Sequence, residues 1–287
     1  MNVLVTGGAG FIGTHLTKRL VRENNKVDVL DDFSRGKKEN KIEKVNYINR
    51  DVRQELNDLE DYDVIFHLAA LARIQPSFDE PLKTIDINAK GTANICDLAK
   101  RIKAKVIYAG SSSFYAGPYL NPYAFSKWQG EEICKMYSKV YGVSTANARF
   151  FNVYGDGQPS TGQYATIVGI FEEQYKAGSP LTITGDGEQR RDFTHVEDIV
   201  SGLILMSKGN WNGEIFNLGT AKNYSINELA AMYKHKTKYI PKRPGEAAKT
   251  LADITFTKEK LGYKPGIDLN DYVRDWLIRA RKNTAID

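Results

Sequence analysis

The 287-residue sequence predicts an α/β protein, in which a doubly wound parallel sheet is followed by a smaller C-terminal α/β lobe. Two observations support this prediction. Up to Phe150, short apolar segments alternate with longer amphipathic ones, as in a parallel sheet with helices on both faces. Past Asn152 the alternation gives way to an irregular loop with several glycines and then to shorter segments. We therefore expect the later residues to be built on the carboxyl edge of the sheet.

The first predicted element is a buried strand at residues 2–6, followed directly by three glycines and an amphipathic helix. In such a strand–turn–helix the glycines allow a tight turn, close approach of the backbone to a pyrophosphate, and close helix packing. The free N–H groups of the helix N-terminus favour phosphate. The segment therefore predicts a Rossmann-type dinucleotide site. Its expected contacts are Gly7, Gly10, Phe11, Ile12 and Gly13.

The composition is that of an ordinary globular protein, with 41% hydrophobic and 26% charged residues. No apolar run approaches the roughly 20 residues that span a bilayer, and the first residues lack the pattern of a signal peptide. We expect a cytoplasmic protein without membrane contact. The only two cysteines, Cys96 and Cys134, have no metal-ligand spacing around them, so we expect reduced thiols and no metal. The net charge of +5 comes from dispersed residues, which argues against nucleic-acid binding.

Acidic residues follow the second and third predicted strands. The second strand, 26–30, ends at Asp31 and Asp32, and the third, 45–48, is followed closely by Asp51. Asp31 has nearly the spacing from the glycine turn at which a carboxylate binds the adenosine ribose, and it would repel a 2′-phosphate. NAD is therefore favoured over NADP. We interpret Asp32 as a solvated loop residue or a helix cap, and Asp51 as an acceptor for the adenine amino group.

The next two predicted strands also end in residues suited to a ligand. The fourth, 63–67, runs into small side chains that let the backbone approach a cofactor, while His67 within it is interpreted as a packed or hydrogen-bonded core residue. A long helix is predicted over 81–102. The fifth strand, 105–109, leads into three consecutive serines. The residues expected near the cofactor after the fourth strand are Leu68, Ala69 and Ala70.

A tyrosine and a lysine lie together at the start of the following helix. Asn121 is a good N-cap and Pro122 suits the first helical position, so Tyr123 and Lys127 share one face. An ammonium about 4–5 Å from the phenol favours the phenolate by roughly 4 kcal/mol at an effective dielectric constant of about 20. We expect Tyr123 to act as a general base near neutral pH. A hydroxyl from Ser111 would share the hydrogen bond to the same substrate oxygen.

The remaining elements suggest two domains. Residues 1–155 are expected to form a dinucleotide-binding domain to which 186–215 return, and residues 156–185 and 216–287 the smaller lobe. The further predicted helices are 122–140, 164–176, 195–208, 225–236 and 269–281, and the further strands are 143–150, 181–184 and 214–218.

Several motifs together resemble one family, the extended short-chain dehydrogenases/reductases that include nucleotide-sugar epimerases and dehydratases. The resemblance implies that the sheet binds NAD, that the smaller lobe binds a nucleotide diphosphate sugar, and that two copies form a homodimer through the helices at 81–102 and 122–140. The motifs are GGAGFIG at 7–13, the acid Asp31, the pair Asp51-Val52, HLAA at 67–70, NAKGT at 88–92, YAFSK at 123–127, ARFFNVYG at 148–155, GDGEQRRDFTHVEDI at 185–199 and RPGE at 243–246.

The resemblance also implies roles for individual residues. The catalytic set would be Ser111, Tyr123 and Lys127, of which the last two also contact the cofactor. Further cofactor contacts would be Val52, Asn88 and Phe150. The substrate would be bound by Ser111 and Ser112, by Asn152 and Arg191 at the diphosphate, by Arg243 and Glu246 at the nucleotide end, and by Thr250 beside the sugar. From the residues alone, Arg243 is a solvated loop residue and Arg191 an ion-pair partner of Asp192.

The residues after Ser111 bear on the reaction. Dehydratases that resemble this chain carry an Asp-Glu pair there and decarboxylases a Glu, whereas this chain has Ser112 and Ser113. The resemblance therefore implies 4-epimerisation of a UDP-hexose or UDP-N-acetylhexosamine through a 4-keto sugar, with Thr250 leaving space for an acetamido group. Dehydration, decarboxylation and a non-catalytic NAD-sensing role remain alternatives. Only eleven residues separate Ser111 from Tyr123, so a loop that flanks the sugar in relatives is missing.

Overall fold

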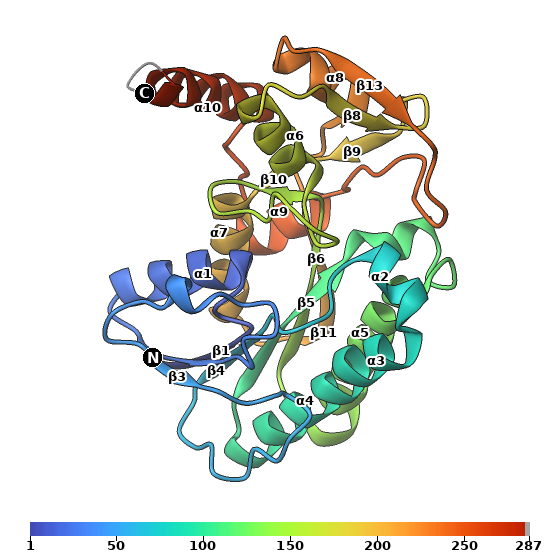
Figure 1. The fold of residues 1–287 in the computed structure, drawn as a ribbon. Coiled ribbons are helices and arrows are strands. Elements are labelled where there is room, and N and C mark those ends of the chain that lie inside the picture. Colours follow the sequence, from blue (N-terminus) through green and yellow to red (C-terminus); the bar gives the residue numbers. More distant parts are fainter. Residues whose placement is uncertain (285–287) are drawn as a thin grey trace.

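The computed structural model describes residues 1–284, and its centre is a seven-stranded sheet (Figure 1). The strand order is β11-β6-β5-β4-β1-β2-β3, and all six pairings are parallel. The predicted doubly wound parallel sheet is confirmed, with the order reversing beside β1, where such sheets bind ligands. The strands are β1 (Asn2–Thr6), β2 (Lys26–Leu30), β3 (Asn46–Ile48), β4 (Val64–His67), β5 (Lys105–Ser111), β6 (Thr145–Phe150) and β11 (Asn212–Leu218).

Helices cover both faces of the sheet, so the central strands β1 and β4 are apolar and buried on both sides. In β1, Val3 and Val5 belong to one core cluster and Leu4 to another, as expected when successive side chains point to opposite faces. The first cluster includes Leu16 of α1 (Phe11–Arg22) and Leu203 of α7 (Val196–Ser207). These two helices pack against each other on one face.

The other face is covered by α4 (Gly91–Ile102) and α5 (Pro122–Tyr141). The helix predicted over 81–102 is formed, but in three parts: α3 (Pro81–Ile85), a wide π-helical turn η2 (Asp86–Lys90), and α4. Asn88 lies within that turn. In α5, the predicted cap is confirmed, since the Ala124 N–H donates to Asn121 Oδ1 at 2.8 Å. Gly142 ends α5 with a φ of +70°.

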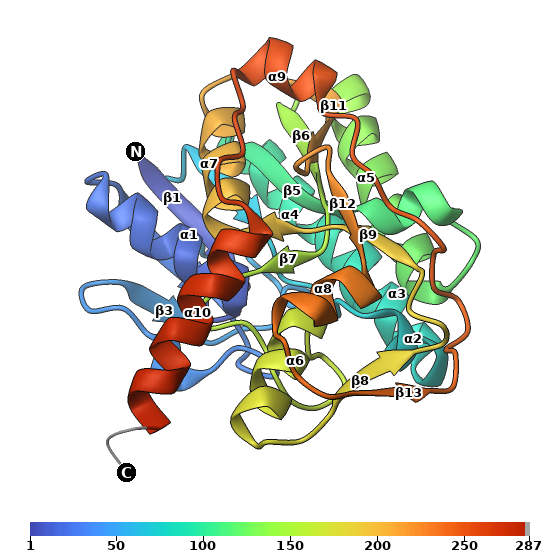
Figure 2. The same ribbon diagram turned by 90° about the horizontal axis from the view of Figure 1, so that it is seen from above.

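A second group of elements stands over the carboxyl ends of the strands (Figures 1 and 2). Its own core includes Phe171, Tyr233 and Trp276. This group contains three short strand pairs. β8 pairs with β13 and β7 with β10 in parallel, and β9 pairs with β12 in antiparallel orientation. The elements are β7 (Val153–Tyr154), α6 (Ile167–Lys176), β8 (Leu181–Thr184), β9 (Arg190–Asp192), β10 (Thr194–His195), β12 (Asn223–Ser225), α8 (Ile226–Met232), β13 (Thr237–Ile240) and α10 (Leu269–Thr284).

Several short elements were not expected from the sequence, among them β12, β13 and α2 (Ile74–Asp79). They are too brief to show a period of their own and are fixed by neighbours distant in the sequence. The others are η1 (Lys38–Asn40), η3 (Ser112–Ala116), α9 (Thr255–Leu261) and the strands β7, β9 and β10. Over residues 1–284, no helix combines the length and the apolar character that crossing a bilayer requires.

Candidate active site

One cavity of about 970 Å³ lies between the carboxyl ends of the strands and the second group of elements. All but one of the site residues predicted from the sequence line it. The exception is Asn88, whose side chain is buried behind the wall. The predicted residues that line the cavity are Gly7, Gly10, Phe11, Ile12, Gly13, Asp31, Asp51, Val52, Leu68, Ala69, Ala70, Ser111, Ser112, Tyr123, Lys127, Phe150, Asn152, Arg191, Arg243, Glu246 and Thr250.

The glycine turn has no room for side chains. Gly7 has a φ of +70°, and a Cβ there would lie 2.8 Å from the backbone nitrogen of Ala69. A Cβ on Gly13 would lie 2.2 Å from the carbonyl oxygen of Gly7, so the helix could not approach the strand as it does. Gly10 is the N-cap of α1 and offers no capping side chain, which leaves the helix N-terminus available to an anion. This cradle fits the pyrophosphate of a dinucleotide.

The Asp31 carboxylate is buried at the tip of β2 and is held by backbone groups. The N–H of Ala9 donates to Oδ2 at 3.0 Å and the N–H of Phe33 to Oδ1 at 2.8 Å. Burial raises the pKa of Asp31, and these two hydrogen bonds oppose the rise. Because an ionised carboxylate has about four acceptor positions, both oxygens can still accept from a ribose diol. The acid and the glycine turn thus fit NAD together.

The two other acids of the cofactor side are already engaged. Asp51 forms an ion pair with Arg53 at 2.6 Å, and the Arg53 guanidinium lowers the pKa of Asp51. Asp32 is exposed and accepts from the N–H and the hydroxyl of Ser34 at 2.9 and 2.6 Å. Asp32 is thus an exposed loop residue that caps its own turn, which agrees with its interpretation from the sequence as a solvated loop residue or a cap.

Asn88 and His67 support the wall of the cavity from behind. Asn88 Oδ1 accepts from the Leu71 N–H at 2.8 Å, and its Nδ2 donates to the Leu71 carbonyl at 3.1 Å. The direct cofactor contact expected for Asn88 is therefore replaced by a hold on the backbone after β4. His67 lies between the hydroxyls of Thr6 and Thr92, and burial lowers its pKa to about 3. It is a neutral core histidine, as interpreted from the sequence.

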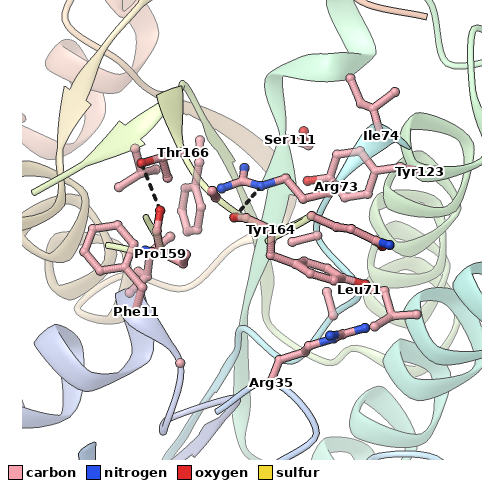
Figure 3. A pocket seen from close by; sticks show the side chains of 18 of the residues that line it. Phe11, Arg35, Leu71, Arg73, Ile74, Ser111, Tyr123, Pro159, Tyr164 and Thr166 are labelled. Carbon is pink, nitrogen blue, oxygen red and sulfur yellow. Dashed lines mark hydrogen bonds between the residues drawn. The ribbon is translucent and has the colours of Figure 1, made fainter. Parts of the chain in front are cut away.

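Ser111, Tyr123 and Lys127 meet in the cavity although they come from two elements. Ser111 ends β5, and its Oγ accepts from the N–H and the hydroxyl of Ser113 at 3.2 and 2.9 Å. Tyr123 lies in the first turn of α5, where its N–H donates to the Ser77 hydroxyl of α2 at 3.1 Å. Figure 3 shows Tyr123 and Ser111 at one end of the cavity.

The electrostatics of this set differ from the expectation. Burial raises the pKa of Tyr123, while the Ser111 hydroxyl and the positive charge of Arg73 oppose that rise. Lys127 lies with Nζ 4.3 Å from the centre of the Tyr108 ring, and burial lowers the pKa of Lys127 to about 8. Lys127 was predicted to lower the pKa of Tyr123, but the positive charge that acts on the phenol is that of Arg73, and burial has the larger effect.

The opposite side of the cavity is lined by residues of the second group. Arg191 Nη2 lies 3.6 Å from the Glu246 carboxylate, so its ion-pair partner is Glu246 and not the Asp192 suggested by the residues alone. Asn152 Nδ2 donates to the Thr250 hydroxyl at 3.2 Å. Arg243 is exposed at the edge of the cavity, as expected of a solvated loop residue, yet it lines the cavity.

The loop at 243–247 packs against α2 and the start of α5. Gln75 of α2 donates to the Pro244 carbonyl at 2.9 Å, and Asn121 Nδ2 donates to the Gly245 carbonyl at 3.2 Å. A Cβ on Gly245 would lie 2.9 Å from the Phe78 ring, so this contact is close. This loop and α2 therefore form one wall near the short segment between Ser111 and Tyr123.

Among the cavity residues that sequence reasoning missed, Arg73 and Arg35 both contact Tyr164. Arg73 donates from Nε to the Tyr164 carbonyl at 2.9 Å, and the Arg35 guanidinium lies 4.0 Å from the centre of the Tyr164 ring (Figure 3). Arg73 follows HLAA at the carboxyl end of β4, a position that could have indicated it. Tyr164 lies in an irregular loop, and no local pattern could have placed it.

The fold and this cavity define a dinucleotide-binding α/β protein of the short-chain dehydrogenase type. Comparison with known proteins narrows the class. Residues 3–219 match the model of the NAD dependent epimerase/dehydratase family. The chain belongs to this family, whose cofactor is NAD.

Named relatives cover the whole length of the chain. A putative UDP-glucose 4-epimerase of Methanocaldococcus jannaschii is 36% identical over 95% of this chain and 96% of its own. UDP-glucuronic acid decarboxylase 1 of Xenopus tropicalis is 31% identical over 98% of this chain and 72% of its own. The crystal structure of UDP-glucose 4-epimerase from Thermotoga maritima with UDP-glucose superposes with a TM-score of 0.93, at 30% identity, over 99% of this chain and 100% of that one.

Proposed function

We propose that this protein is an NAD-dependent 4-epimerase of a nucleotide diphosphate sugar, a UDP-hexose or UDP-N-acetylhexosamine, that works through a transient 4-keto sugar. The observation that carries the proposal is the meeting of Ser111, Tyr123 and Lys127 in the cavity that also holds the glycine turn. Family membership and the named epimerase relatives support it.

Each residue of the set has a separate task in this reaction. Tyr123 takes the proton of the sugar 4-hydroxyl, and Ser111 hydrogen-bonds to the same oxygen and holds it against the phenol. The Lys127 ammonium adds positive charge at this end of the cavity. When bound, NAD supplies the hydride acceptor and donor for C4 and a cationic ring that favours the Tyr123 phenolate. The residues that would hold NAD are the glycine turn, Asp31, Asp51, Val52, Phe150 and the backbone at 68–70.

The stereochemical outcome depends on how the keto sugar is held. In this proposal Arg191 and Asn152 bind the diphosphate, and Arg243 with Glu246 the nucleotide, while the sugar itself can turn over. Arginine suits a phosphate because its planar fork makes two charge-assisted hydrogen bonds. C4 gives up its hydride from one face of the sugar ring. After the 4-keto sugar has turned over, C4 receives the hydride on the opposite face.

A second candidate function is decarboxylation, because relatives include UDP-glucuronic acid decarboxylases. The residues after Ser111 favour epimerisation, since Ser112 and Ser113 are far weaker bases than a carboxylate at the same place. We also propose two domains, which differ at their borders from those expected from the sequence. The first is the sheet with its helices, including α7 and β11 through Leu218, and the second is the group that includes β7, β9 and β10. A homodimer and a cytoplasmic location complete the proposal.

The purified protein, incubated with NAD and each of several UDP-sugars, tests the proposal. Chromatography and mass spectrometry should find the 4-epimer at unchanged mass, without release of CO2 or water. The Tyr123→Phe variant should keep its bound NAD and lose roughly 10³-fold in kcat, because the general base is gone. Near-normal turnover by this variant would refute the assigned base, and a product lighter by CO2 would favour the decarboxylase.

A further inference from the structure

Arg73 is a cationic side chain of the cavity that the proposed reaction does not use. It is the N-cap residue of α2, a few residues past the carboxyl end of β4, and it lines the cavity. Its positive charge acts on the Tyr123 phenol, and Figure 3 shows Arg73, Tyr123 and Ser111 side by side. Arg73 therefore lies where the reacting end of the sugar would lie.

The Arg73 guanidinium has donors to spare. Its Nε donates to the Tyr164 carbonyl at 2.9 Å. Within residues 1–284, neither Nη atom has a hydrogen-bond partner, and no carboxylate forms an ion pair with this side chain. A guanidinium carries five N–H donors, so four are left. Arg73 is half-buried in the cavity wall, and burial lowers the pKa of its guanidinium. A partly desolvated charge without a counter-ion is unfavourable, which indicates that an anionic partner comes with a ligand.

The surroundings hold this guanidinium in place. Asn88 binds both backbone groups of Leu71, two residues before Arg73, and the Tyr164 carbonyl fixes Nε. A fork held in position in this way is suited to a planar acceptor.

The carboxylates that line the cavity already have partners in the described chain. Asp31 accepts from backbone N–H groups, Asp51 pairs with Arg53, and Glu246 lies beside Arg191. The pyrophosphate of NAD fits the N-terminus of α1, and the sugar diphosphate is assigned above to Arg191. A neutral hexose would offer Arg73 only hydroxyl groups.

We propose that Arg73 binds a carboxylate carried by the sugar, so that the preferred substrate is an acidic nucleotide sugar. This inference rests on the proposed function and names its substrate class. The planar fork of an arginine matches a carboxylate in two parallel hydrogen bonds, which a lysine could not reproduce. Two sources share this chemistry: the C6 carboxylate of a hexuronic acid, and an acid joined to the ring through an ether.

Two pairs of probes separate these sources. UDP-glucuronic acid is compared with UDP-glucose, and UDP-N-acetylmuramic acid with UDP-N-acetylglucosamine, each with the NAD-loaded protein. In one of the two pairs the acid should have the higher kcat/KM. Arg73→Gln should lower that value by about 30-fold more for the acid than for its neutral counterpart, because both lose the charge that acts on Tyr123 and only the acid loses the contact to its carboxylate. Arg73→Lys should recover part of the loss.

Arg279→Gln is the matched control, because it removes the same charge from an exposed side chain of α10 that does not line the cavity. If Arg73→Gln slowed all four substrates equally and moved the acidic limb of the pH profile to higher pH, Arg73 would act only through the pKa of Tyr123. That result would overturn the proposal, as would a wild-type preference for both neutral sugars.

Calorimetric titration of the same four sugars keeps the two proposals distinguishable. If only the neutral sugars were turned over, the proposed epimerase activity would be supported and the proposed carboxylate recognition would be wrong. Without any turnover, tighter binding of an acid that Arg73→Gln abolishes would support carboxylate recognition while the epimerase fails. Equal binding of acidic and neutral sugars would contradict carboxylate recognition by Arg73.

Discussion

The two halves of the cavity are built in different ways. The cofactor half consists mainly of backbone at strand ends, and its centre is one continuous segment, residues 7–13. The half that we assign to the sugar consists of side chains from elements far apart in the sequence, among them Arg73 at the start of α2, Arg191 of β9 and Arg243 of a loop. Backbone geometry permits few alternatives, whereas side chains can be exchanged without refolding the chain. The first half therefore fixes the cofactor, and the second decides the substrate.

The largest effect is expected from a substitution in the cofactor half of the cavity. Gly13→Ala places a Cβ 2.2 Å from the Gly7 carbonyl oxygen, so the turn must open and bound NAD should be lost. The measurement is the NAD content of the purified protein, with thermal unfolding alongside. Gly266→Ala is the matched control, because a Cβ there meets nothing within 4 Å. Full NAD content in Gly13→Ala would contradict the assigned cradle.

A smaller effect is expected at Lys127, where the halves meet. Its pKa of about 8 lies below the 10.5 of the unfolded chain, so the unfolded state binds more protons between these values. Stability contributed by this site therefore rises with pH in that window. Lys127→Met should raise the free energy of unfolding by about 3 kcal/mol at pH 7, and this gain should shrink as the pH rises towards 10.

Urea unfolding of the wild type and of Lys127→Met at pH 7, 8, 9 and 10 measures this difference. A gain that stayed constant over the series would mean that the wild-type ammonium is not destabilised by burial.

The smallest of the three effects concerns the sugar half alone. Arg191→Gln should weaken the binding of UDP-sugars and of UDP by about 30-fold, because a charge-assisted contact to phosphate is lost. NAD content should not change. The neighbouring Arg190 pairs with Glu228 and does not line the cavity, so Arg190→Gln is the control. Equal losses of UDP-sugar affinity in both variants would contradict the assignment of Arg191 to the substrate site.

The same difference between the halves explains what the sequence could predict. The glycine turn, Asp31 and the capped helix at Tyr123 depend on neighbours close in sequence, and each carries a local pattern. Arg73 and Tyr164 meet across ninety positions of the chain through a carbonyl oxygen, and no periodicity announces such a contact. The π-helical turn that contains the buried Asn88 is likewise invisible in an amphipathic pattern.

The pKa of Tyr123 shows a further limit of prediction from sequence. The sequence correctly predicts that Tyr123 and Lys127 lie on one face of the same helix. The burial that raises the pKa of Tyr123, however, depends on the whole surrounding fold. Fold class and cofactor are therefore predictable from local patterns, while the energetics of the site require its three-dimensional surroundings.

One measurement tests the central claim most directly, namely that a single cavity oxidises C4 and returns the hydride to its other face. The NAD-loaded protein is incubated with a UDP-sugar deuterated at C4 in ordinary water, and the product is analysed by NMR and mass spectrometry. We predict a 4-epimer that keeps the deuterium at C4 and gains no solvent hydrogen at C5. Loss of the label from C4, or a product altered at C5 or C6, would contradict the account.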